Sequence, residues 1–168
     1  MNAGAGRWMS FMAAVILVAA QNAAGLPAAG TVAPDFASKS ASGRNVRLSE
    51  LRGQVVLVNF WASWCGPCRQ ELPLLNKIYE QYRAAGFTLL AVNLDDNRKD
   101  ADAMLKRLDL RFPTLFDGGK SVAKLYGVDT MPATLVIDRD GRVRYVHRGY
   151  YQGYERKYEQ QVRELLKE

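Results

Sequence analysis

Thiol and imidazole groups are scarce in this chain of 168 residues, which holds two cysteines and one histidine. A structural zinc site needs four ligands, most often from these two residue types, so the sequence excludes a zinc-stapled fold. The two cysteines, Cys65 and Cys68, are separated by only two residues. They can therefore pair only with each other or with another molecule, which points to thiol–disulfide chemistry.

A concentrated positive charge is also missing. The formal net charge is +6, but the arginines are scattered along the chain and form no dense basic run. Binding of nucleic acid requires such residues to cluster on one face. We therefore expect no nucleic-acid partner.

No apolar run reaches the roughly 20 residues that a helix needs to cross a bilayer. Residues 8–20 are apolar except for Ser10; they follow a single positive charge at Arg7, and no acidic residue occurs before Asp35. Small residues come next, an order typical of a secretory signal peptide. We expect a signal peptide at residues 1–24, a flexible lead-in at 25–31 and a folded domain at 32–168. The protein would then be periplasmic or otherwise extracytoplasmic, and an uncleaved anchor is the alternative.

Hydrophobic patterns predict alternating strands and helices in the folded domain. Continuous β-branched and aromatic runs are typical of buried strands, and apolar residues three and four apart are typical of helices. An early strand–helix–strand unit implies parallel strands, and an Asp-Gly turn predicts a late hairpin. We expect an α/β fold with a mixed central sheet, helices on both faces and a short N-terminal β extension. The predicted strands are residues 54–61, 87–94, 133–137 and 143–148, and the predicted helices are residues 65–85, 100–108, 121–126 and 154–167.

The cysteines lie at the start of the first predicted helix, where Pro67 fits because its missing N–H costs nothing in the first turn. The partial positive charge of a helix N-terminus favours a thiolate over a thiol. We expect Cys65 to be the exposed nucleophile and Cys68 to be the buried resolving thiol. A purely structural disulfide is the alternative, but a loop this short restrains the unfolded chain very little.

The segment at residues 58–73, with Trp64-Cys65-Gly66-Pro67-Cys68 at its centre, closely resembles the thioredoxin superfamily. The leader, the Ala33-Pro34-Asp35-Phe36 opening and residues 92–96 are similar to the TlpA/ResA-like exported thiol–disulfide reductases, a resemblance that covers about residues 32–167. It implies a thioredoxin-like fold and a protein-disulfide reductase that uses Cys65 and Cys68. We expect neither a cofactor nor a metal ion.

The resemblance also implies supporting roles near the cysteines. Thr130-Met131-Pro132 matches the cis-proline segment of the family, which pairs with the backbone of the substrate. An ordinary turn before a strand is the alternative reading of this segment. Asp96 matches an acidic residue that approaches the cysteines in such reductases, although a solvated loop residue is the competing interpretation.

Three residues of the motif itself complete the expected site. Trp64 is expected to shield the sulfurs and to contact partners, and Gly66 and Pro67 lie between the cysteines. Cytosolic thioredoxins have a buried aspartate where this chain has Asn59, and an asparagine cannot accept a proton. Some other group must assist Cys68 if any does.

The resemblance implies two kinds of partner: client proteins with disulfides, such as apocytochrome c before haem attachment, and a membrane-embedded thiol electron donor. We expect a monomer. The main alternative function is a disulfide oxidase or isomerase, which would use the same two cysteines. A peroxidase is a further alternative, but the sequence lacks the Pro-x-x-x-Thr-x-x-Cys motif that it would need. A copper-binding chaperone is another, and it would need His147 as its third ligand.

Overall fold

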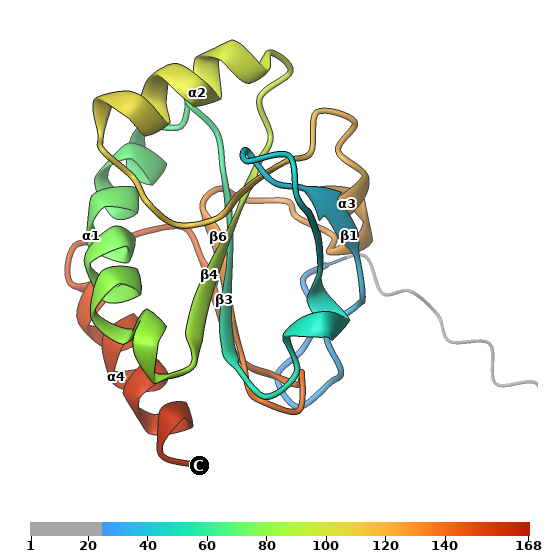
Figure 1. Cartoon of the computed structure of the whole chain (residues 1–168), viewed down its shortest axis with the longest axis vertical. Coiled ribbons are helices and arrows are strands. Elements are labelled where there is room, and N and C mark those ends of the chain that lie inside the picture. The colour runs from blue at the N-terminus through green and yellow to red at the C-terminus, as the bar shows by residue number, and fades with distance from the viewer. Residues whose placement is uncertain (1–24) are drawn as a thin grey trace, which may run out of the picture.

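The structure, a computed structural model, describes residues 25–168, so the predicted signal peptide lies outside the described residues. Its centre is a five-stranded sheet of order β5-β4-β3-β6-β7, beside a small two-stranded sheet of β1 and β2 (Figure 1). The strands are β1 (Ala37–Lys39), β2 (Asn45–Arg47), β3 (Val55–Trp61), β4 (Phe87–Asn93), β5 (Thr114–Phe116), β6 (Ala133–Ile137) and β7 (Val143–Arg148). The helices are α1 (Gly66–Tyr82), α2 (Arg98–Arg107), α3 (Ser121–Leu125) and α4 (Tyr154–Leu166), with short 3-10 turns η1 (Leu48–Leu51) and η2 (Arg83–Ala85).

Strand β3 is the middle of the sheet, and all seven of its residues are buried. It pairs in parallel with β4 and antiparallel with β6. The parallel pair requires a crossover, which α1 supplies. In the antiparallel pair Asn59 lies opposite Thr134, so two polar side chains meet inside the core. The predicted mixed α/β fold is confirmed.

Two hydrophobic clusters cover the two faces of the sheet. One contains buried residues of α1, α2 and α4, and the other contains residues of α3 and of the N-terminal segment. Figure 1 shows α1 and α4 on one side of the sheet and α3 with β1 on the other. The helices thus flank both faces, as the alternating pattern predicts.

One strand is absent from the sequence prediction. Strand β5 has only three residues and pairs in parallel with the end of β4. A run this short has no readable periodicity, and its pairing is decided by tertiary contacts. The other predicted elements are present, with ends shifted by a few residues. The first helix ends at Tyr82, and after the turn η2 the chain leaves through Gly86, whose φ of 91° favours glycine.

The N-terminal segment is attached to both edges of the large sheet. At the end of the predicted lead-in, the N–H of Gly30 donates to the carbonyl of Val143 at 2.7 Å, and the N–H of Val143 donates to Thr31. Farther on, Ser40 forms a β-bridge with Leu115 of β5. This segment therefore crosses the sheet from β7 to β5. Within residues 25–168, none of the helices combines the length and apolar character that a bilayer crossing requires.

Candidate active site

The two cysteines lie at the N-terminus of α1, directly after the carboxyl end of β3. Cys65 is the N-cap residue of the helix and Cys68 is in its first turn, with Pro67 between them. The two sulfurs are 2.03 Å apart and form a disulfide. The N–H of Cys68 donates to the sulfur of Cys65 at 3.2 Å. A free helix N–H therefore already points at the atom that would carry the thiolate charge.

The two cysteines differ in exposure in the predicted order, but the difference is much smaller than expected. Cys68 has no exposed surface, whereas Cys65 is 6% exposed. Cys65 is thus less accessible than we predicted, because the disulfide holds it against the core cluster that includes Trp61 and Ala62. The neighbouring Trp64 side chain is 65% exposed, so this indole lies on the surface beside the nearly buried sulfur.

A buried carboxylate holds the loop that precedes the cysteines. The two oxygens of Asp95 accept the backbone N–H of Ser63 at 3.1 Å, and Oδ1 accepts its hydroxyl at 2.9 Å. The amide of Asn93 also donates to Asp95, at 2.8 Å. Since Ser63 is two residues before Cys65, Asp95 fixes the path of the chain into Cys65.

The structure does not direct Asp96 toward this loop. Its side chain is 92% exposed and forms an ion pair with Lys120 at 2.7 Å. At the end of β4, consecutive residues point to opposite sides, and it is Asp95 rather than Asp96 that points to the motif. The expected approach of Asp96 to the cysteines is therefore not observed. Asp96 is a solvated loop residue, as in the competing interpretation.

A second carboxylate, Glu71, is buried one turn after Cys68 on the same helix. The Asn59 amide donates to Oε2 at 2.8 Å, and the Tyr158 hydroxyl donates to Oε1 at 2.7 Å. The Thr134 hydroxyl, which also accepts from Asn59, lies 3.4 Å from Oε1. Residues from β3, β6, α1 and α4 thus meet around one acid.

Burial is the main reason that the pKa of Glu71 is raised, from 4.5 to about 7. The hydrogen bonds from Tyr158, Asn59 and Thr134 act in the opposite direction because they stabilise the charged form. The same burial, together with the charge of Glu71, raises the pKa of Tyr158. Glu71 is therefore an acid that changes charge near neutrality, one helical turn along the chain from the buried Cys68.

Glu71 was not predicted from the sequence because a glutamate inside a helix normally lies on the surface. A signal was available: Glu71 is three residues after Cys68, and Leu72 and Leu75 follow it on the buried side of the helix. Asp95 was not predicted either, because it is one of two adjacent aspartates after a strand, and such residues normally lie in solvent.

The peptide bond between Met131 and Pro132 is cis, as the resemblance implies. Pro132 is buried, Met131 is partly buried and Thr130 is exposed. The carbonyl of Pro132 accepts the N–H of Gly149 at 2.7 Å, which ties this segment to the loop before α4. Met131 packs against both core clusters.

The single histidine plays a packing role. His147 on β7 lies edge-on to Tyr158, with ring centres 4.8 Å apart, and its Nε2 is 2.9 Å from the side-chain oxygen of Gln161. Its burial lowers the pKa of the imidazole. Across residues 25–168, no three histidine, cysteine or acidic side chains are grouped closely enough to hold a metal ion.

Comparison with known proteins places this geometry among redox proteins. Residues 29–146 match the AhpC/TSA family. The thiol-disulfide oxidoreductase ResA of Geobacillus thermodenitrificans is 38% identical over 122 residues, which cover 73% of this chain and 70% of that protein. The ResA of Bacillus cereus strain ATCC 10987 is 35% identical over 114 residues, covering 68% of this chain and 66% of its own.

Solved structures agree with this relationship. A crystal structure from Chlorobium tepidum, provisionally assigned as thiol:disulfide interchange protein DsbE, is 42% identical and superposes with a TM-score of 0.79, covering 84% of this chain and 99% of that one. The secreted thiol-disulfide isomerase of Corynebacterium glutamicum is 31% identical, with a TM-score of 0.71 and coverage of 80% and 85%.

Proposed function

The chain belongs to the AhpC/TSA family, and from this premise we propose that it is a thiol–disulfide oxidoreductase that reduces disulfide bonds in client proteins. The observation that carries the proposal is the Cys65–Cys68 disulfide at the start of α1. Oxidoreductases at 33–38% identity support it. Cys65 and Cys68 are the catalytic residues, and their disulfide is the oxidised form of the protein.

The exchange proceeds in two steps. The Cys65 thiolate attacks one sulfur of a client disulfide, so a mixed disulfide forms and the client's own S–S bond breaks; the departing sulfur takes up a proton. The Cys68 thiolate then attacks Cys65, which breaks the mixed disulfide and releases the second client thiol. The client gains two electrons, and the protein is left with the Cys65–Cys68 disulfide. A thiol donor must reduce it again.

The local geometry suits both steps. The N–H of Cys68 at 3.2 Å and the helix N-terminus stabilise a thiolate on Cys65. The second step is intramolecular because Cys68 is held in the adjacent turn, and this raises the effective concentration of the attacking thiol. Cys68 has no solvent contact, so its proton needs a nearby acceptor within the protein.

We assign this proton to Glu71 in place of the solvent-exposed Asp96. Glu71 lies one helical turn beyond Cys68, is buried, and has its pKa raised to about 7. A base with a pKa near the working pH transfers protons most effectively. The carboxylate accepts the proton of Cys68 as this thiol becomes the nucleophile, and the Asn59 and Tyr158 donors hold it in place.

The surface around the sulfurs supplies client binding in this proposal. The backbone of Met131, before the cis bond to Pro132, offers hydrogen bonds to an extended client segment. The exposed indole of Trp64 offers an apolar contact, and Pro67, between the two cysteines, is exposed as well. We also propose clients such as apocytochrome c, a membrane-embedded thiol donor and an extracytoplasmic location, and the similarity to ResA proteins supports these proposals.

A trapping experiment tests the function. In Cys68→Ser the first attack still occurs but no thiol remains to resolve the mixed disulfide, so a covalent complex with a model disulfide protein should accumulate. The control Cys65→Ser should form none, because the buried Cys68 cannot reach the client. A reduction potential at the oxidising end of the thioredoxin-fold range would reverse the proposed direction of transfer. Loss of trapping in Cys68→Ser would remove the proposed mechanism.

A further inference from the structure

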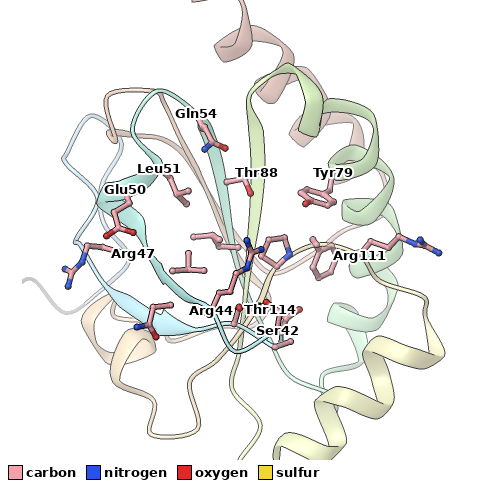
Figure 2. A pocket seen from close by; sticks show the side chains of 17 residues that line it. Ser42, Arg44, Arg47, Glu50, Leu51, Gln54, Tyr79, Thr88, Arg111 and Thr114 are labelled. Carbon is pink, nitrogen blue, oxygen red and sulfur yellow. Dashed lines mark hydrogen bonds between the residues drawn. The ribbon is translucent and has the colours of Figure 1, made fainter.

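We propose that a cavity remote from the cysteines binds a small organic monoanion with an apolar body, of the aryl or fatty carboxylate kind. The cavity has a volume of about 600 Å³ (Figure 2), which is within the range of small-molecule sites. Tyr79 is the only residue of α1 that lines the cavity. This residue is 11 positions after Cys68, or about 16 Å along the helix, so the cavity is separate from the disulfide.

Unequal strand lengths create the cavity. Strand β4 has seven residues but β5 has three, and β5 pairs only with the second half of β4. The hairpin of β1 and β2 is held to β5, where the N–H of Ala41 donates to the carbonyl of Thr114 at 2.8 Å. Space therefore remains between this hairpin and the first half of β4, from which Thr88 and Leu90 line the cavity.

The lining combines an apolar wall with a larger number of polar side chains. Its hydroxyl groups belong to Ser40, Ser42, Tyr79, Thr88 and Thr114, and Glu50 is its only acidic residue. Figure 2 shows these side chains arranged around the space, with Thr88 and Tyr79 on one side and Leu51 on the other. The apolar wall is formed by Val46, Leu51, Leu90, Phe112 and Pro113.

Three arginines line the cavity, but only one is available to a ligand. Arg47 is paired with Asp35 at 2.9 Å, and Arg111 is paired with Asp109 at 3.1 Å. Both point away from the space in Figure 2, whereas Arg44 reaches toward its middle. Among the residues that the structure describes, no carboxylate lies within ion-pair distance of Arg44.

This arrangement selects the class of ligand. A guanidinium presents a planar pair of donors that matches a carboxylate. The partly exposed side chains of Val46, Leu51 and Pro113 offer an apolar surface beside it. A ligand with several charges would find only one inward cation and would meet Glu50. A single anionic group attached to a flat or linear apolar body is therefore the chemistry that fits.

The test uses the isotope-labelled full chain and two probes with the same apolar body, naphthoate and the neutral naphthylmethanol, followed by amide NMR. Naphthoate should shift the amide signals of Thr88, Leu90 and Phe112 with a saturable curve, and the neutral alcohol should bind at least about tenfold more weakly. Arg44→Gln should lower naphthoate affinity by about tenfold or more. The matched control Arg47→Gln, on the same hairpin but pointing outward, should bind as the unaltered protein does.

Specific outcomes would overturn this proposal. They are shifts that do not saturate at millimolar naphthoate, shifts centred on Trp64, or equal affinity in Arg44→Gln and Arg47→Gln. An unchanged amide spectrum of unliganded Arg44→Gln shows that its fold is intact, and Thr88→Phe, which fills the space, should also abolish binding. The double variant Cys65→Ser, Cys68→Ser should bind naphthoate normally, so the result does not depend on the redox function.

Discussion

The Asp95 carboxylate accepts both the backbone N–H and the hydroxyl of Ser63, at distances of 2.9–3.1 Å. A side chain at the end of β4 thereby positions the loop that leads from β3 into the disulfide. The two segments are 32 residues apart in the chain. The reactive loop is thus held by its neighbouring strand as well as by its own helix.

Replacing Asp95 by alanine should impair both stability and reactivity. Ser63 and Asn93 would lose their buried acceptor, which should lower the free energy of unfolding by about 1–3 kcal/mol. A loop that is free to shift should slow attack by Cys65 by at least about tenfold. Denaturant unfolding and the rate of reduction of a model disulfide measure the two effects.

The adjacent aspartate is the control. Asp96→Ala removes only an exposed pair with Lys120, and its effect on the free energy of unfolding should stay within about 0.5 kcal/mol. If Asp96→Ala slowed the reaction more than Asp95→Ala, the assignment of the loop-positioning role to Asp95 would be wrong.

Glu71 should make the stability of the oxidised protein depend on pH. Its pKa is 4.5 in an exposed setting and about 7 in the fold, so the folded state binds this proton more tightly. The contribution of Glu71 to the free energy of unfolding is therefore most favourable at low pH, and it is lost as the pH rises from 4.5 to about 7. The loss is on the order of 3 kcal/mol.

Unfolding free energies measured across this pH window check the point. Glu71→Gln, which cannot ionise, should flatten the profile, whereas Glu80→Gln, an exposed site on the same helix, should keep it. Identical slopes in the unaltered protein and Glu71→Gln would show that the carboxylate does not titrate there.

Tyr158 should tune the same acid from α4. Its hydroxyl donates to Glu71 at 2.7 Å, and this bond lowers the pKa of the carboxyl. Tyr158→Phe should therefore raise the pKa of Glu71 above about 7 and move the pH profile of client reduction to higher pH. Carboxyl NMR of Glu71 gives the value directly. The control is Tyr82→Phe, whose hydroxyl binds Glu159 instead; a shift as large in this variant would count against a specific role for Tyr158.

The two tryptophans around the motif should separate stability from function. Trp61 has no exposed surface and Trp64 is 65% exposed. Trp61→Ala should cost about 3–5 kcal/mol through the cavity that it leaves. Trp64→Ala should change stability by less than about 0.5 kcal/mol but weaken complex formation in the trapping assay. Unimpaired trapping by Trp64→Ala would mean that the indole does not contact clients.

The fold was predictable where hydrophobic patterns are long. Strand β3 and helix α1 have seven and 17 residues, which is enough to show their periods and to place the cysteines at the start of the helix. Strand β5 has three residues, and its position is determined by pairing with β4. No local pattern carries this information.

The candidate site was predictable where a motif is contiguous. Cys65 and Cys68 could be recognised from their spacing, but the acid beside them could not. Glu71 is buried because Asn59 and Tyr158, 12 residues before it and 87 after it, supply hydrogen bonds. Such a cluster exists only after the sheet and both helices have assembled, so a sequence pattern identifies the helix but not the charge state of its glutamate.

The N-terminal segment that crosses from β7 to β5 has a consequence for how this molecule meets other chains. Exposed sheet edges invite strand addition and aggregation, and here one stretch of backbone protects both ends of the same sheet, at Val143 and at Leu115. At these two points the protein's own backbone takes the place that a strand of another chain would need, so fewer free edge groups remain for chance pairing with other chains.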